Sequence, residues 1–396
     1  MNYILFDNES WQNFLPLTFT RPISEIRIGI LRISEKWNKY LNQEISYMTQ
    51  DCLSKKYPMN KAAENILINA CVLPNTALIE AIHSLSKGQV LVHDGILIAA
   101  LVSEDKLDSF DISLPDYAEK IIFEGELVRI EKAYDVFQLN DKALRDDFEL
   151  LTACRKSQPI SKTVNVLGEE NIFLEECAKV EFATLNANEG PIYIGKDAEI
   201  MEGALVRGPL AMCEHSALKL GAKVYGATTL GPYCKSGGEL SNVVFLGYTN
   251  KAHDGFLGNA VIGEWCNIGA DTNNSNLKNN YSEVKLWNYK SNRFDKTGLQ
   301  FCGTIMGDHS KCGINTMLNT GTVIGVSANV YGAGFPRNFI PSFSMGGKHG
   351  FQEYRLKAAH EVAQLVMQRR GLEFDKIEEE IMDHVFEITA KYRKSF

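Results

Sequence analysis

The sequence predicts an α/β domain, then a parallel β-helix, then C-terminal helices. Three observations predict this order: apolar runs that alternate with helix-like stretches over about residues 1–150, a six-residue repeat from about residue 191, and an amphipathic tail from Gln352. At 396 residues, the chain is long enough for two or three domains of roughly 150 residues. We place an α/β domain at 1–155, a connector at 156–190, the β-helix at 191–348 and a helical tail at 349–396.

The first 150 residues show the alternation of an α/β domain. Short apolar runs (YILF, NILINACVL, GQVLVHDGILIAALV and KIIF) alternate with helix-like stretches (SEKWNKYLNQ and NDKALRDDFELLTACRK). Such alternation is typical of a mostly parallel sheet that is covered by helices.

The next region repeats every six residues, and each block opens with an aliphatic residue. The lead residues are Ile194, Ile200, Val206, Met212, Leu218, Val224 and Leu230, then, after a change of phase, Phe256, Ile262 and Ile268, and finally Met306, Cys312, Leu318 and Ile324. A triangular coil of three short strands needs one inward apolar residue per six, and stacked coils bury these residues together. The repeat therefore predicts a parallel β-helix; the alternative is a β-sandwich with accidental spacing.

Two further segments flank or interrupt the repeat. The insertion Asn279–Gly298 is polar and aromatic, and it is expected to be a loop on one face, either a binding element or a decorative hairpin. The tail Gln352–Phe396 has apolar residues at helical spacing, which predicts one or two amphipathic helices.

Composition narrows the class of protein. The balance of 41 basic and 49 acidic residues gives a net charge of −8, which argues against a broad nucleic-acid surface. The nine cysteines are scattered without a CxxC pair, which excludes a zinc ribbon and predicts a reducing compartment. With neither a signal peptide nor a membrane-length apolar run, we expect a cytoplasmic protein without membrane contact.

The stretch HDGFLGNAVIGEWCNIGADTNNSN, residues 253–276, resembles the acetyltransferase active site of the bifunctional N-acetylglucosamine-1-phosphate uridyltransferase/glucosamine-1-phosphate acetyltransferase family. The resemblance implies a left-handed β-helix in which His253 is the general base that activates the amine of the sugar. It implies that Glu239 supports the histidine and that Asn267 and Asn276 contact sugar or acetyl groups.

The same resemblance implies a coenzyme A groove along GDHSKCGINT and VIGVSANVYGAG, with Ile314 and Gly332 among its residues. Two positions depart from the family. Phe256 stands where the family has a tyrosine, and Ser241 stands where it has a phosphate-binding lysine, for which Lys251 or Lys278 could substitute.

The motif FLPLTFTRPISEIRIGILRISEKW, Phe14–Trp37, resembles the start of a divergent, mainly Bacteroidetes branch of sugar nucleotidyltransferase-like proteins. This resemblance implies a Rossmann-like nucleotidyltransferase domain in which Arg21 and Arg27 bind nucleotide phosphates. The glycine-rich loop of ordinary members is absent, and Asn69 and Ala70 stand where they have a magnesium-binding aspartate. Mg²⁺ would then need another carboxylate, such as Asp7, Asp94, Asp135 or Asp141.

Together the resemblances imply a homotrimeric enzyme of sugar-nucleotide biosynthesis. It would transfer an acetyl group from acetyl-CoA to an amino-sugar 1-phosphate, and a nucleotidyl group, most simply uridylyl, to a sugar 1-phosphate. Two alternatives stay open: a monofunctional acyltransferase whose degenerate N-terminal domain only binds a nucleotide-sugar, and a non-catalytic trimeric scaffold.

Overall fold

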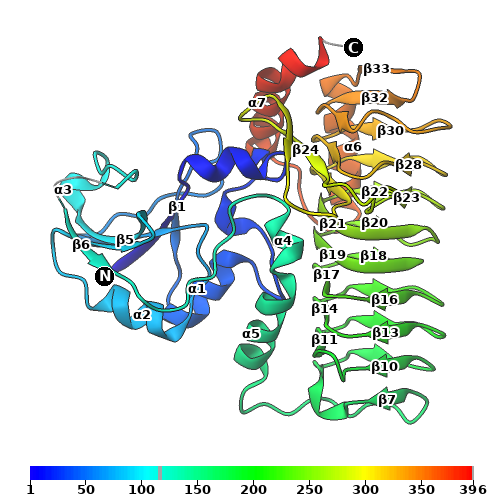
Figure 1. Cartoon of the computed structure of the whole chain (residues 1–396), viewed down its shortest axis with the longest axis horizontal. Helices are drawn as coiled ribbons and strands as arrows, with labels where there is room; N and C mark the ends of the chain where they lie inside the picture. The colour runs from blue at the N-terminus through cyan, green and yellow to red at the C-terminus, as the bar shows by residue number, and fades with distance from the viewer. Residues whose placement is uncertain (115–117, 395–396) are drawn as a thin grey trace. The chain divides into compact units, whose positions relative to one another are not determined.

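The computed structural model of the protein describes residues 1–114 and 118–394, and Figure 1 shows the whole chain. The chain forms two compact units. The first comprises Met1–Phe14, Arg21–Ile26 and Leu31–Lys132, and the second comprises Leu15–Thr20, Arg27–Ile30 and Ala133–Phe396. Two short segments near the N-terminus therefore belong to the second unit, although the rest of that region forms the first.

The first unit is built on a six-stranded sheet in the order β2-β1-β3-β5-β4-β6. Apolar residues are buried on both faces of the sheet, with Ile4, Leu67 and Val90 on one face and Leu5, Ile66 and Leu91 on the other. The strands are β1 Asn2–Phe6, β2 Ser46–Met48, β3 Glu64–Asn69, β4 Gln89–His93, β5 Ile96–Ser103 and β6 Glu119–Ile122. The helices are η1 Glu9–Phe14, η3 Ile23–Glu25, α1 Ile33–Leu41, α2 Thr76–His83 and α3 Glu104–Leu107.

This sheet is mixed, with three parallel and two antiparallel strand pairs among those described. The long apolar run GQVLVHDGILIAALV is not one strand but a hairpin of β4 and β5. Asp94 and Gly95 form its turn, and both have positive φ, as a two-residue hairpin turn requires. The predicted α/β fold is confirmed, with an antiparallel hairpin added at this turn, whereas the unit ends at Lys132 and not at residue 155.

The second unit is a β-helix whose strands stack in parallel on three faces (Figure 1). Face 1 holds β7 Asn165–Leu167, β10 Thr184–Asn186, β13 Leu205–Arg207, β16 Lys223–Tyr225, the first parts of β19 Glu239–Gly247 and β21 Phe256–Glu264, and then β23 Asn273–Asn274 and β28 Met317–Leu318. Face 2 holds β8 Ile172–Leu174, β11 Ile192–Ile194, β14 Leu210–Met212, β17 Thr228–Leu230, the second parts of β19 and β21, β26 Thr304–Met306, β29 Thr322–Ile324 and β31 Phe339–Ile340. Face 3 holds β9 Lys179–Val180, β12 Glu199–Ile200, β15 Ala217–Leu218, β18 Lys235–Ser236, β20 Asn250–Lys251, β22 Asn267–Ile268, β27 Lys311–Cys312, β30 Asn329–Val330 and β32 Ser344–Gly347, which pairs with β33 Gly350–Glu353.

The six-residue repeat is confirmed by what fills the interior of this β-helix. Every lead residue named above except Phe256 is at most 3% exposed. Phe256 is only half-buried, and its neighbour Leu257 faces the interior instead. The coil from Val224 to Leu240 has 240 − 224 = 16 residues and the coil from Leu240 to Leu257 has 257 − 240 = 17, against 224 − 206 = 18 for the coil from Val206 to Val224. These two short coils explain the change of phase.

The β-helix begins earlier than the repeat indicates. Strands β7 to β10 lie within residues 156–190, where the sequence predicts a connector. Val180 and Leu185 already face the interior there. Glutamate and lysine at the outward positions hide the repeat in these first coils, because nothing constrains an outward residue to be small or apolar.

Helices complete the second unit. They are η2 Leu17–Phe19, α4 Asp135–Gln138, α5 Asn140–Thr152, η4 Glu169–Asn171, α6 Leu356–Gln368 and α7 Lys376–Arg393. The predicted C-terminal helices are confirmed, and α7 packs on the last coils, where Phe386 meets Phe343 edge to face at 5.1 Å. The insertion 279–298 forms an antiparallel hairpin of β24 Lys285–Asn288 and β25 Arg293–Lys296.

Candidate functional site

The corner between face 3 and face 1 brings three of the predicted site residues into one series. Each of the three comes two residues after the end of a face 3 strand. His253 follows β20, which ends at Lys251, Ile314 follows β27, which ends at Cys312, and Gly332 follows β30, which ends at Val330. Successive coils of such a stack are roughly 4.8 Å apart. Ile314 is two coils beyond His253 and Gly332 is three, so the three residues span about 14 Å along this corner.

The side chain of His253 is exposed at this corner. The preceding corner consists only of Gly237 and Gly238, and the following one contains Gly269 and Ala270, so neither offers a large side chain that would cover the imidazole. The loop that carries His253 packs tightly on the two glycines. A Cβ on Gly237 would lie 2.5 Å from the carbonyl oxygen of Ala252, and one on Gly238 would lie 2.7 Å from that of Gly255.

A buried lysine lies beneath this loop. Lys251 occupies an inward position of face 3, is 1% exposed, and donates from Nζ to the carbonyl oxygens of His253 at 2.9 Å and Gly237 at 3.3 Å. Burial lowers the pKa of Lys251 to about 8, although the carboxylates of Asp254 and Asp271 act in the opposite direction. Because Lys251 points into the β-helix, it is placed to hold the histidine loop rather than a phosphate.

Glu239 begins the face 1 part of β19, and its register partner on the next coil is Phe256. Its carboxylate accepts a hydrogen bond of 2.6 Å from the hydroxyl of Tyr225. This bond raises the pKa of the tyrosine. The tyrosine thus fixes the carboxylate on face 1, next to the corner that carries His253.

The two predicted asparagines lie at other positions around the coil. Asn267 is exposed on face 3 and accepts a hydrogen bond of 3.1 Å from Asn250 on the coil before it. Asn276 follows face 1 and donates to Asn259 at 2.8 Å. A third asparagine, which the sequence argument did not single out, is buried: Asn274 pairs with both the N–H and the carbonyl of Gly258.

The two predicted phosphate-binding arginines are both buried, at 4% exposed for Arg21 and 5% for Arg27. They belong to different units. Arg27 donates from its guanidinium to the carbonyl oxygens of Leu246 at 3.2 Å and of Ile30. These contacts hold the segment 27–30 against the β-helix.

The same segment is fastened by side chains of α5. The N–H of Gly29 donates to Asn140 and that of Ile30 donates to Asp147, both at 2.7 Å. Gly29 has φ of +74°, and a Cβ there would lie 2.6 Å from the carbonyl oxygen of Ala143. Only glycine permits this approach of the segment to the helix.

The first unit offers one buried carboxylate at the end of β1. Asp7 accepts hydrogen bonds from the N–H of Ile23 at 3.0 Å and the hydroxyl of Thr49 at 2.6 Å. Burial raises its pKa to about 6, although these two bonds act in the opposite direction. Asn69, at the end of β3, is also buried and binds the carbonyl oxygen of Leu97.

Within residues 1–114 and 118–394, no group of three or more His, Cys, Asp or Glu side chains is arranged to hold a metal ion. The four aspartates considered as magnesium ligands are therefore not gathered into such a group. In the same parts of the chain, no helix is both long and apolar enough to cross a membrane.

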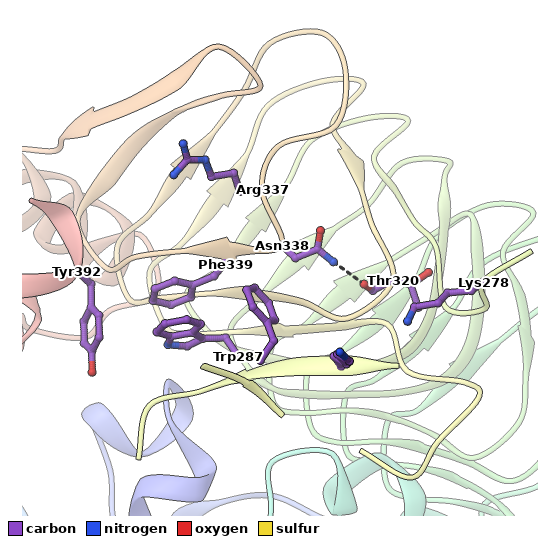
Figure 2. A pocket seen from close by; sticks show the side chains of 9 residues that line it. Lys278, Trp287, Thr320, Arg337, Asn338, Phe339 and Tyr392 are labelled. Carbon is purple, nitrogen blue, oxygen red and sulfur yellow. Dashed lines mark hydrogen bonds between the residues drawn. The ribbon is translucent and has the colours of Figure 1, made fainter. Parts of the chain in front are cut away.

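A cavity of about 790 Å³ in the second unit lies beside the insertion that the sequence predicts to be either a binding element or a decorative hairpin. Figure 2 shows it. The residues that line it are Lys278, Lys285, Trp287, Phe294, Thr320, Arg337, Asn338, Phe339 and Tyr392. In the sequence, the aromatic and basic residues of the insertion were the available signal of this cavity. Residues 320, 337–339 and 392 join them only in the folded chain.

Residues 3–156 match the sequence profile of the sugar nucleotidyl transferase family. A bifunctional sugar-1-phosphate nucleotidylyltransferase/acetyltransferase of Sulfurisphaera tokodaii is 28% identical over 264 residues, which cover 65% of this chain and 59% of the relative. The bifunctional protein GlmU of Synechococcus elongatus is 22% identical over 227 residues, which cover 51% of this chain and 46% of the relative. The chain thus spans less than two thirds of the length of either relative.

Among solved structures, a UDP-N-acetylglucosamine acyltransferase, LpxA, from Bacteroides fragilis is 15% identical and covers 59% of this chain and 84% of its own, with a TM-score of 0.28. The sequence matches confirm the resemblance to bifunctional nucleotidylyltransferase/acetyltransferases that the motifs indicate.

Proposed function

We propose that the protein is a bifunctional transferase of sugar-nucleotide biosynthesis, which transfers an acetyl group from acetyl-CoA to an amino-sugar 1-phosphate and a nucleotidyl group to a sugar 1-phosphate. The observation that carries the acyl-transfer part is the exposed His253 at the corner where Ile314 and Gly332 follow it. The family profile over residues 3–156 and the bifunctional relatives support the nucleotidyl part.

In the acyl-transfer step, the imidazole of His253 accepts the proton of the amino group as the nitrogen attacks the thioester carbonyl. The C–N bond forms, the C–S bond breaks, and the leaving thiolate takes up a proton. Glu239, held by Tyr225, supplies negative charge beside the corner. The open corner next to Ile314 and Gly332 leaves room for an extended pantetheine arm.

A trimer would bring together side chains that one chain keeps apart. Asn267 lies on face 3 and His253 at the corner that follows face 3, and we infer that a neighbouring chain supplies one of them to a common site. Large apolar side chains are exposed along the same corner, among them Phe182, Leu220 and Ile314 at 64%, 67% and 70%. These three side chains lie two and four coils apart along the corner, and together with the resemblance to the bifunctional family they lead us to infer a homotrimer that packs at this corner.

The test of the acyl-transfer part is the variant His253→Ala, with His349→Ala as its matched control. His349 is also exposed but lies between β32 and β33. Loss of a general base lowers turnover by roughly 10²- to 10⁴-fold. We expect His253→Ala to lower acetyl transfer by such a factor at unchanged mass in solution, whereas His349→Ala keeps full activity. Equal activity of the two variants would remove His253 from the mechanism.

A second candidate function concerns the N-terminal domain alone. Arg27 binds backbone carbonyls and Asn69 stands in place of a carboxylate, which favours a domain that binds a nucleotide-sugar without making one. Among residues 1–114 and 118–394, no three carboxylate, histidine or cysteine groups are gathered to hold a metal ion, and we assign no step to the metal. Pyrophosphate release from UTP and N-acetylglucosamine 1-phosphate, with and without Mg²⁺, separates the two candidates: release supports the bifunctional enzyme, and binding without release supports the second.

A further inference from the structure

The cavity beside the hairpin β24–β25 has an aromatic side and a polar side (Figure 2). In the view of Figure 2, the rings of Trp287, Phe339 and Tyr392 gather on one side, whereas Thr320 and Lys278 lie on the other. The lining includes none of the predicted catalytic, sugar-binding or coenzyme A-binding residues of the acyl-transfer site. The cavity is therefore distinct from the corner that carries the proposed acyl transfer.

The aromatic side is packed before any ligand arrives. Trp287 stacks on Phe339 with ring centroids 4.2 Å apart and planes inclined by 11°. Tyr392 stands at right angles to Phe339 at 5.7 Å, and its hydroxyl donates to Asn292 in the turn of the hairpin at 2.8 Å. Phe294 is the cross-strand partner of Trp287 and is 41% exposed. The ring of Phe294 thus offers a free apolar surface on a fixed support.

The positive charge around the cavity is neither gathered on one wall nor wholly free. Lys278 donates to the backbone carbonyl of Glu283 at 2.7 Å. The N–H of Gly298, and then Lys296 and Lys278, lower the pKa of Glu283, so its carboxylate is ionised near neutral pH and offsets part of this charge. In the view of Figure 2, Arg337 lies at the opposite end of the cavity from Lys278. The cations therefore do not form one cradle for a phosphate group.

The polar side keeps both kinds of hydrogen-bonding group available. Lys278 uses one of its three N–H donors on Glu283, and the ammonium of Lys285 has no partner among the described residues. The amide of Asn338 donates to the carbonyl oxygen of Thr320 at 2.7 Å, whereas its side-chain oxygen accepts from no described residue. A ligand that fits this side must both accept and donate hydrogen bonds, as hydroxyl groups do.

The polar side is also fixed in position. The hydroxyl of Thr320 donates to Ser275 at 2.8 Å. Gly321 has φ of +71°, and a Cβ there would lie 2.5 Å from the carbonyl oxygen of Lys285. The hairpin therefore rests directly on this glycine, which sets the position of Lys285.

We propose that this cavity binds a sugar of one or two rings, with its C–H faces on the aromatic side and its hydroxyl groups on Lys278, Lys285 and Asn338. A sugar ring is apolar on its faces and polar at its rim, which matches an aromatic wall that stands opposite donors and an acceptor. The volume of about 790 Å³ lies in the range of roughly 300–1,000 Å³ that is typical of small-molecule sites. An aliphatic chain would bury the polar groups without partners, and free phosphate would leave the aromatic side uncovered.

The test uses the full chain labelled with 5-fluorotryptophan, so that ¹⁹F NMR reports on the four tryptophans separately, and Trp287→Phe assigns the resonance of Trp287. Three probes are titrated: cellobiose, glucose 1-phosphate and inorganic phosphate. We expect at least one of the two sugars to shift the Trp287 resonance with saturation, and inorganic phosphate to leave it in place. The sugar that binds more tightly shows whether the site takes a neutral sugar or a sugar phosphate.

Phe294→Leu and its matched control Phe335→Leu assign the binding to the cavity. Leucine keeps an apolar side chain on the hairpin but removes the flat ring. Phe335 is 48% exposed and is not part of the lining. Contact with an aromatic ring contributes roughly 0.5–1.5 kcal/mol, so we expect Phe294→Leu to weaken sugar binding about two- to tenfold. Phe335→Leu should leave it unchanged.

Three results would overturn the proposal: a Trp287 resonance that neither sugar shifts at tens of millimolar, phosphate that binds as tightly as the sugars, or equal affinities of the two phenylalanine variants. Because the readout is binding at Trp287, it does not depend on acetyl or nucleotidyl transfer. Failure of the proposed enzymatic function would leave it unaffected.

Discussion

Lys251 occupies a position where the six-residue repeat places an aliphatic side chain. Its neighbours above and below on face 3 are Ile268 and Ser236. The buried ammonium is stabilised by carbonyl oxygens of the corner that carries His253. A buried cation is costly to folding, so we expect this lysine to serve the histidine loop at the expense of stability.

The variant Lys251→Met tests this expectation. The folded-state pKa is about 8 and the ordinary value is 10.5, so between these pH values the unfolded chain binds more protons. Raising the pH through this window therefore stabilises the wild type, by up to about 3 kcal/mol at 1.36 kcal/mol per pKa unit. Lys251→Met should lack this rise and should melt higher than the wild type at pH 7, while its acetyl transfer falls.

Denaturant unfolding at pH 7, 8.5 and 10 measures the difference. Lys223→Met, at an exposed lysine on face 1, is the control and should follow the wild type. A Lys251→Met variant whose stability changes with pH as the wild type's does would show that folding does not lower the pKa of Lys251.

At the scale of the element, the loop of His253 rests on the corner of the coil before it, which contains Gly238. Gly238 has φ of +72°, and a Cβ there would meet the carbonyl oxygen of Gly255 at 2.7 Å. Gly221 lies at the same corner one coil earlier, with φ of +68° and open space around its missing Cβ. The two glycines therefore share the backbone requirement and differ in the contact with the histidine loop.

We expect Gly221→Ala to lower the free energy of unfolding by about 1 kcal/mol, the usual cost of positive φ for alanine. Gly238→Ala should cost at least about 1 kcal/mol more, and it should also lower acetyl transfer because the loop of His253 must move. Urea unfolding together with the acetyl-transfer assay measures both effects. Equal losses of stability would show that the loop does not rest on Gly238.

For the whole molecule, assembly is the feature that one chain cannot display. The exposed apolar side chains at the corner between face 3 and face 1 predict contact with another copy. Leu220→Glu places a charge there and should convert the proposed trimer to monomers and abolish the proposed acetyl transfer. Ile122→Glu, at a residue that is 65% exposed in the first unit, is the control and should leave the mass unchanged.

Light scattering after gel filtration measures both variants against the wild type. A monomeric wild type that transfers acetyl groups would contradict the proposed assembly. A trimer that survives Leu220→Glu would place the interface elsewhere on the β-helix.

The sequence by itself determined the elements whose cause is local or periodic. An inward aliphatic residue every six positions specifies a stack of coils, because each coil is stable only when the next one covers its apolar edge. Helical spacing in the tail specified α6 and α7 in the same way. The change of phase near Phe256 was visible as well, but which neighbour faces inward depends on two successive short coils of 16 and 17 residues, from Val224 to Leu240 and from Leu240 to Leu257.

Only the tertiary structure decided what distant segments do together. It placed Lys251 inside the β-helix, put Arg27 on backbone carbonyls, and gathered Lys278, Arg337 and Tyr392 around one cavity. No local pattern encodes such arrangements, because they depend on segments that are distant in the sequence, such as Arg27 and Leu246 or Lys278 and Tyr392. They exist only once stacked coils, hairpin and helix hold those side chains within a few ångströms of one another.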